Sequence, residues 1–522
     1  MIKQVNSHEF SILLHERSQV LISNSARIVK EGAEHFELTR PLLSLLQAES
    51  MQLEELLDAY GAKSNQNWYR FRMHIAMLKN MSCAGYELLH LRHTCHTYDF
   101  EGTLKNFERD TDGALQYVTS FLFCALKHLL NDTQSFNWPP PEEMLGYDFS
   151  EKLPEGRLPK DRSFAGRESA QQLVIQLATS FLNSTEDAKF LDTAAKSSAP
   201  KWRGLNLELL SEASIRRLQG RFHNLQSLYD TYVSYSNIED KDTSLRRLRG
   251  HISLVLHLLT VTTIFMHFYE RHIELQGDEL FCRKNCVLKG HWFLELLTHY
   301  LCHYSYEFLS SARGLCQQML RKYAVVDTIE VPAPRYFGFH VRPSTLISTI
   351  VRHYGSDVSM ILDKEYDASI PMNLFLANEW INQLKRTHVT DELVKLDDVL
   401  AQAQRQVDEG EKTRIEAVHY LIRQMAKRDM IHVLVYPVNV EAVVKSSTAP
   451  SLLELMQTVI ANLHAQRCIN INYTINVRFR GDIRILNDIR ILAENGYGEN
   501  ERGANVALPA ELSYLNHFRP GL

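Results

Sequence analysis

Two long stretches of the chain repeat apolar residues at a spacing of three and four, which is the pattern of amphipathic helices. The first stretch predicts a helical domain over residues 1–135, with leucines such as Leu42, Leu46 and Leu53 facing its core. The second stretch predicts another helical domain over residues 166–324. Residues 136–165 are rich in proline and charge, so we expect a linker or a long surface loop there.

The two helical stretches share a weak internal similarity. Residues 71–93 align with residues 248–270 at a constant offset of 177, which places His74 on His251 and His90 on His267. This alignment predicts that the second helical domain repeats the first. The matches are few, so chance similarity of two helical sequences is the alternative.

From residue 325 onward the pattern changes to short β-branched runs that alternate with helical segments. We expect an α/β domain over residues 325–465 that carries a helical insertion at 388–428. The expected strands cover 325–331, 358–362 and 431–436, and the expected helices cover 344–354, 373–384, 390–427 and 451–464.

The end of the chain predicts a strand–helix extension over residues 466–522. Residues 469–480 alternate strictly between apolar and polar side chains, which is typical of one long amphipathic strand. A helix over 482–494 follows, and Asn495-Gly496 is a stop signal for it. We expect the segment after Gly498 to be irregular.

Composition and net charge indicate a helical protein that is not a general nucleic-acid binder. Only 22 glycines and 15 prolines occur in 522 residues, which favours long helices, and a net charge of −5 argues against general nucleic-acid binding. The eight cysteines show no disulfide spacing and the N-terminus has no signal-peptide core, so we expect a cytoplasmic protein. The most apolar window, Ile252–Tyr269, contains two histidines and three threonines, and we interpret it as a buried core helix and not a membrane span.

One motif between a strand and a helix carries candidate chemistry. It runs from Gly338 to Ser344, and Pro343 suits the first turn of a helix, so His340 lies just before the helix N-terminus. Free N–H groups and the helix dipole favour an anion there, and Arg342 adds donors suited to phosphate oxygens. An imidazole in that place can accept a phosphoryl group. The alternative is a histidine that only packs or caps the turn.

These residues resemble the HPr phosphocarrier of the bacterial sugar phosphotransferase system. The family pattern is a strand, Ala-Pro, a loop, Gly-aliphatic-His-x-Arg-Pro-small and a helix; here it begins at Ala333-Pro334 and continues from Gly338 to Ser344. The similarity continues into the helix and the strand at 358–362, and it resumes at residues 373–375. Strand 431–436 and helix 451–464 are similar to the closing strand and last helix of the family, so the resemblance covers about 100 residues.

The resemblance implies a fold and a function. The fold class would be α+β and multidomain, with a large all-α region followed by an HPr-like open-faced β-sandwich with inserted helices. His340 would be the phosphoacceptor and Arg342 would stabilise the phosphate. Leu374 and Phe375 would form the apolar surface that docks partners, and an Enzyme I-like protein would be the phosphoryl donor.

The sequence also departs from the family. Phe337 stands where the family usually has an asparagine that seats the histidine, and the loop before Gly338 is about two residues longer. Asn373 replaces the regulatory serine, and residues 390–427 interrupt the family pattern. These differences imply a regulatory or sensor protein and not a free-standing carrier, and they favour a phosphoryl-carrier or regulatory role over a turnover enzyme.

Two other classes of function stay open. One is a scaffold that keeps the HPr-like fold without the chemistry, and the other is a helical-bundle enzyme with an unidentified ligand or metal. The helical region would bind an unknown protein partner in the regulatory case. No glycine-rich phosphate loop and no nucleophile elbow appear in the sequence, so we expect no nucleotide or other cofactor.

Metal-ligand residue types cluster in two places, but their spacing matches no compact zinc pattern and supplies only part of a di-iron site. We therefore expect buried cysteines and interfacial histidines and no metal. The two clusters are Cys282, Cys286, His291, His299, Cys302 and His303 in one, and Glu87, His90, His93 and His96 in the other.

Overall fold

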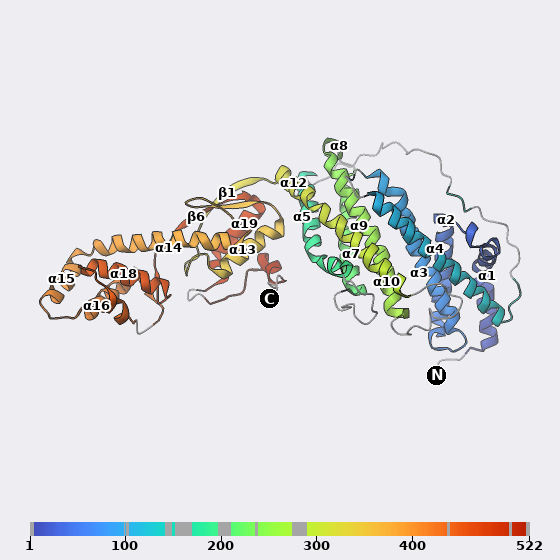
Figure 1. The fold of residues 1–522 in the computed structure, drawn as a ribbon, viewed down its shortest axis with the longest axis horizontal. Coiled ribbons are helices and arrows are strands. Elements are labelled where there is room, and N and C mark those ends of the chain that lie inside the picture. The colour runs from blue at the N-terminus through green and yellow to red at the C-terminus, as the bar shows by residue number, and fades with distance from the viewer. Residues whose placement is uncertain are drawn as a thin grey trace. The chain divides into compact units, whose positions relative to one another are not determined.

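The structure is a computed structural model of the whole chain, which separates into two compact units (Figure 1). The helical unit comprises residues 1–319 and the α+β unit comprises residues 320–522. The region expected to form two helical domains therefore clusters as one unit. The structure describes residues 5–98, 100, 104–140, 149–151, 170–196, 210–234, 238–273, 290–435, 439–500 and 504–517.

Long helices make up the described part of the helical unit, as the periodicity predicts. Polar residues cap several of them: the Asn6 side chain accepts from His8 N–H at the start of the first helix, and Asp242 accepts from Ser244 N–H at the start of α9. The main helices are α1 (Ser7–Glu31), α2 (Arg40–Ala59), α3 (Tyr69–Thr94), α4 (Leu104–Ser135), α5 (Ala170–Asp187), α6 (Lys189–Ala195), α7 (Glu212–Leu228), α8 (Ile238–Lys241), α9 (Thr243–Phe268), α10 (Gly290–Glu295), the π-helix η7 (Leu296–Cys302), α11 (His303–Ser311) and α12 (Arg313–Tyr323).

Helices α3 and α9 occupy comparable places in this unit. Each has 26 residues, α3 packs between α2 and α4, and α9 packs between α7 and α11. His74 on α3 contacts Asp132 of α4, and His251 on α9 contacts the Phe308 carbonyl of α11. This order of helices supports a duplication, which stays a prediction until the two halves are superposed.

The second pair of aligned histidines has unlike surroundings. The His90 ring lies 4.2 Å from the His257 ring on the facing helix, whereas His267 contacts Glu212 of α7. The surroundings of this second pair therefore give the duplication no support.

Thr243–Arg271, which includes α9, is the one helix in the described residues that is long and apolar enough to cross a membrane. Of its most apolar window, 78 % is buried inside the structure. The window therefore packs as a core helix.

The α+β unit is built on a four-stranded antiparallel sheet in the order β1-β6-β2-β3. The central strand β6 pairs Phe479 with Ile329 on one side and with Met360 on the other. Helices α13, α14 and α19 pack on the apolar side, and exposed polar residues of β6 such as Arg478 and Arg480 leave the other face open. The elements of the sheet and its helices are β1 (Val326–Pro332), α13 (Val341–Tyr354), β2 (Val358–Ile361), β3 (Glu365–Asp367), α14 (Pro371–Val394), β6 (Asn476–Asp482) and α19 (Ile483–Glu494).

A second, smaller hydrophobic core lies between α14 and β6 in the sequence. We call residues 389–472 the inserted lobe, in which four helices pack with a two-stranded sheet, β4 paired with β5. Its elements are α15 (Asp397–Asp408), α16 (Arg414–Lys427), β4 (Ile431–Val433), α17 (Glu441–Ser446), α18 (Leu452–Ala465) and β5 (Ile469–Ile471).

The inserted lobe corrects three sequence-based expectations. The strand at 431–436 and the helix at 451–464 do not close the main sheet, because β4 and α18 belong to the second core. The expected long strand at 469–480 is divided: β5 pairs in the lobe and β6 in the main sheet. The insertion therefore extends well beyond 388–428. In the segment 469–480, apolar and polar residues continue to alternate through the connection at 472–475. The alternation therefore gives no sign that the segment forms two separate strands.

Helix α14 connects the two cores without interruption. Its first half buries Leu374 and Ile381 in the core under the main sheet, and its second half buries Val389 and Leu393 in the core of the inserted lobe. The expected helix boundary near Thr390 does not exist, because that residue lies inside the helix.

Candidate functional site

The loop before α13 holds the predicted phosphoacceptor in an unusual backbone conformation. Phe337 and Gly338 both have positive φ, 54° and 61°, so the chain turns sharply just ahead of Phe339 and His340. The Phe339 side chain is buried in the core under the sheet. The turn therefore fixes the direction in which the next residue leaves the loop.

Asn378 of α14 seats this loop. Its Nδ2 donates to the Phe337 carbonyl at 2.7 Å, and its Oδ1 accepts from Phe339 N–H at 3.1 Å. An asparagine thus supports the histidine loop although Phe337 occupies the family's usual asparagine position. The sequence carries no local signal for this contact, because Asn378 lies about 40 residues further along the chain.

His340 is the residue that precedes the first turn of α13, as the motif predicts. Its carbonyl accepts from Ser344 N–H at 3.1 Å, and its side chain makes no capping bond. The ring is held on both sides: Nδ1 lies 3.1 Å from the Gly338 carbonyl, and Nε2 lies 2.9 Å from Oε1 of Glu499. The side chain of His340 is 18 % exposed and that of Glu499 is 5 % exposed.

Arg342 lies in the first turn of α13, beside the same carboxylate. Its Nη2 donates to the Val506 carbonyl at 3.1 Å, and its buried Nε has no hydrogen-bond partner among the described residues. Burial raises the pKa of Glu499, while His340 and Arg342 act to lower it. One anionic group at the N-terminus of a helix is therefore in contact with an imidazole and lies near a guanidinium that has a spare donor.

Glu499 belongs to a turn that follows α19, which we call the C-terminal hook (residues 496–500 and 504–506). Three consecutive residues, Gly496, Tyr497 and Gly498, have positive φ, and the Tyr497 hydroxyl donates to the Pro332 carbonyl at 2.6 Å. Val506 N–H donates to the Gly498 carbonyl, which closes the turn. Sequence reasoning missed this part of the site, because no motif links residue 499 to residue 340.

The predicted docking pair is divided between the core and the surface. Leu374 is fully buried, so its side chain is not available to a partner, whereas Phe375 is 43 % exposed. On a helix, adjacent residues point about 100° apart, and here the core takes Leu374. Met372 and Leu376 beside Phe375 are also exposed, as is Val341 next to His340.

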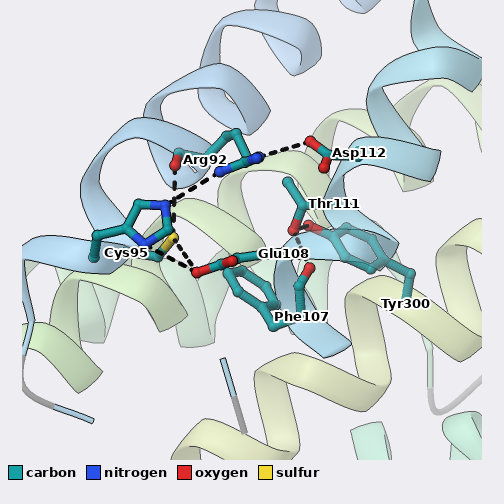
Figure 2. A network of polar contacts seen from close by, with 8 residues as sticks. Arg92, Cys95, Phe107, Glu108, Thr111, Asp112 and Tyr300 are labelled. Carbon is teal, nitrogen blue, oxygen red and sulfur yellow. Dashed lines mark hydrogen bonds and ion pairs between the residues drawn. The ribbon is translucent and has the colours of Figure 1, made fainter. Parts of the chain in front are cut away.

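A separate polar network in the helical unit brings together three metal-ligand types, Cys95, His96 and Glu108 (Figure 2). His96 Nδ1 lies 3.0 Å from Glu108, and Arg92 Nη1 lies 3.2 Å from His96 Nε2. A histidine that binds metal through Nδ1 needs an acceptor at Nε2, but a guanidinium can only donate. Burial and Glu108 also raise the pKa of the Cys95 thiol. The network is therefore a satisfied hydrogen-bond chain and a poor metal site.

The other candidate metal ligands, as far as the structure describes them, do not converge either. Cys282, Cys286 and the side chain of His291 lie outside the described residues. Cys302 is buried, and His303 contacts Glu307. His93 contacts Glu151 and Glu87 contacts His257, so neither faces a common centre with His96.

The described part of the helical unit contains a larger and a smaller cavity, among others. The larger, of about 930 Å³, lies along α4 and η7 and mixes cations and anions, including Arg109, Lys127, Glu295 and His299. The smaller, of about 480 Å³, contains the Glu87–His257 pair, whose side-chain atoms lie 2.5 Å apart. Burial and His257 lower the pKa of the adjacent His90 to about 4. The hydroxyl that lines the smaller cavity belongs to Thr260, which donates to the Leu256 carbonyl at 2.8 Å and accepts from Gln219 Nε2 at 3.1 Å, so it is already engaged and does not bond His257.

In comparisons with models of protein families, with curated proteins and with solved structures, the chain gives no match.

Proposed function

We propose that the α+β unit is an HPr-like domain that accepts a phosphoryl group on His340, within a cytoplasmic regulatory or sensor protein. One observation carries the proposal: at the N-terminus of α13, His340 contacts an anionic group, the carboxylate of Glu499, and Arg342 lies near enough to act on the pKa of that carboxyl. A site that binds a buried carboxylate supplies the positive charge and donors that a phosphoryl group needs.

The order of elements supports the same proposal. Strand, helix, strand, second helix, closing strand and last helix follow one another as in the HPr family once the inserted lobe and the short strand β3 are set aside. In this reading β6 and α19 take the places of the closing strand and last helix. The open polar face of the sheet agrees with an open-faced β-sandwich.

The chemistry assigned to the site is a phosphoryl transfer. A lone pair on one nitrogen of His340 attacks the phosphorus of a donor phosphohistidine on an Enzyme I-like protein. The new N–P bond forms, the donor's N–P bond breaks, and the donor imidazole keeps the electron pair. Arg342 and the N–H groups of the first turn of α13 stabilise the phosphoryl oxygens.

The domain would serve as an endpoint and not as a relay. Only Phe375 of the expected docking pair is exposed, and the inserted lobe extends from the far end of the same helix α14. A reduced docking face predicts slow transfer from the donor and poor transfer to sugar permeases. The helical unit would then read out the phosphorylated state by binding a protein partner.

The direct test is labelling of the purified full-length chain with radiolabelled phosphoenolpyruvate, Enzyme I and HPr. We expect acid-labile label on one histidine of the 23, and no label in His340→Ala. Label that persists in this variant would refute His340 as acceptor. If neither the correctly folded wild-type chain nor its Glu499→Gln variant takes label from this system or from phosphoramidate, the scaffold alternative is favoured.

A second experiment tests the endpoint role. The chain is expressed in a cell that lacks its own HPr, and sugar uptake is measured. We expect little restoration of uptake; full restoration would show an open docking face and would exclude a sensor that passes no phosphate on.

A further inference from the structure

We propose that Glu499 is an autoinhibitory ligand of the His340 site, so that the C-terminal hook must leave the site before phosphoryl transfer. This inference rests on the proposed phosphoacceptor role of His340. It goes beyond that role because it assigns a closed resting state and names the group that closes it.

The first argument is the hydrogen bonding of the ring. Both nitrogens of His340 face acceptors, the Gly338 carbonyl at Nδ1 and the Glu499 carboxylate at Nε2. With Glu499 ionised, both contacts are satisfied only when each nitrogen carries a proton. An imidazole in that form has no free lone pair, so it cannot attack phosphorus.

The second argument is charge. A phosphoryl group brings about two negative charges, and a buried carboxylate within hydrogen-bond distance of the accepting ring would repel it strongly. The Glu499 side chain is 5 % exposed, so water screens little of that repulsion. Arg342 interacts with the Glu499 carboxylate, and its unpartnered Nε would be available to a phosphoryl oxygen once the hook has moved.

The third argument is the way the hook is attached. Gly498 has a φ of 74°, and a side chain there would place Cβ 3.0 Å from Arg342 Nη2, so the backbone fits closely over the guanidinium. Besides the Glu499–His340 contact, two hydrogen bonds hold the described hook, from Tyr497 to the Pro332 carbonyl and from Arg342 to the Val506 carbonyl. The Tyr497 side chain is buried in the core under the sheet, so the movement required is that of Glu499 and the residues after it.

The experiment uses the full-length chain and phosphoramidate, a small phosphoryl donor that needs no docking protein. Glu499→Gln keeps the shape of the side chain and removes its charge. We expect this variant to be phosphorylated about tenfold faster than wild type or more, which corresponds to the loss of one charge-assisted hydrogen bond. Glu494→Gln, which removes an exposed carboxylate five residues earlier, is the matched control and should react like wild type.

A second variant loosens the hook without touching the carboxylate. Tyr497→Phe removes the tether to the Pro332 carbonyl and should also accelerate phosphorylation, by less than Glu499→Gln. Thermal unfolding of each variant checks that the α+β unit remains folded.

The outcomes separate the two proposals. Wild-type labelling on His340 with an equal or slower rate in Glu499→Gln would overturn autoinhibition and leave the phosphoacceptor role intact. Absence of label from wild type and both variants would overturn the phosphoacceptor role, and autoinhibition with it.

Discussion

The side-chain amide of Asn378 closes over Gly338. It bonds the backbone on both sides of this glycine, and a Cβ on Gly338 would lie 1.8 Å from Asn378 Oδ1. The loop that carries His340 is thus shaped by a residue on α14 and by the absence of a side chain at position 338. This fit leads to a double-mutant prediction.

Gly338→Ala should displace the loop, because the methyl group meets Asn378 and φ of 61° disfavours alanine by about 1 kcal/mol. Asn378→Ala should cost about 1–3 kcal/mol by leaving two loop groups unpaired. The double variant should lose less stability than the sum of the two, because the clash partner is gone. Chemical denaturation of the four chains measures this; strict additivity would contradict the fit.

Arg342→Gln should slow phosphorylation of His340 much more than it lowers the free energy of unfolding. The guanidinium makes one hydrogen bond, to the Val506 carbonyl, and its charge matters most when a phosphoryl group arrives. Arg352→Gln removes an exposed arginine from the last turn of the same helix and is the control. Labelling rates and thermal melts of both variants give the comparison, and equal losses in both measurements for Arg342→Gln would argue for a purely structural role.

Leu374 and Phe375 should separate into a core residue and a surface residue. Leu374→Ala should destabilise the α+β unit by about 2–5 kcal/mol, as for a leucine removed from a packed core. Phe375→Ala should change stability little and should weaken transfer from the donor protein while leaving reaction with phosphoramidate unchanged. A loss of the phosphoramidate reaction in Phe375→Ala would show that this residue acts on the site and not on docking.

His251 should make the helical unit sensitive to acid. Burial lowers its folded-state pKa to about 4, and its Nδ1 contacts the Phe308 carbonyl at 2.9 Å. In the unfolded chain this histidine has a pKa of about 6.5, so it binds a proton there at a higher pH than in the folded chain. The contribution of neutral, buried His251 to the free energy of unfolding is therefore complete above pH 6.5 and is lost as the pH falls toward 4. The loss from this one group is about 3 kcal/mol.

The measurement is the free energy of unfolding at pH 7 and at pH 4.5. His251→Leu should show a smaller difference between the two values than wild type, whatever its absolute stability. His8→Leu, at an exposed position near the start of α1, should keep the wild-type difference. An unchanged pH dependence in His251→Leu would place the acid sensitivity elsewhere.

The helices of the first unit could be predicted because their signal is local. Apolar spacing within one helix, as in Leu42, Leu46 and Leu53, reports which face is buried. Strand pairing is not local. Ile431–Val433 and Val477–Phe479 both place a polar residue between two apolar ones, so they look alike in the sequence. Only the packing of distant segments decides that the second one pairs with β1 and β2.

The candidate site divides in the same way. His340 and Arg342 stand in one motif with Pro343 and were found from it. Glu499 and Asn378 reach the site from other elements, and neither has a sequence pattern that marks a ligand of His340. Leu374 is buried and not on a docking surface, because adjacent residues of a helix point about 100° apart and the resemblance does not fix which of the two faces the core.

The uninterrupted helix α14 has a consequence for how the α+β unit unfolds. An inserted domain that is joined to the surrounding domain by two neighbouring loops can unfold on its own, because its unfolding disrupts no secondary structure of the surrounding domain. Here the inserted lobe and the main sheet share helix α14. Ile381 and Val389 lie about two turns apart on this helix, and each belongs to a different core. Unfolding of the inserted lobe would remove the packing of the second half of α14, and the helix would then fray toward Asn378. Both cores should therefore unfold in one cooperative transition.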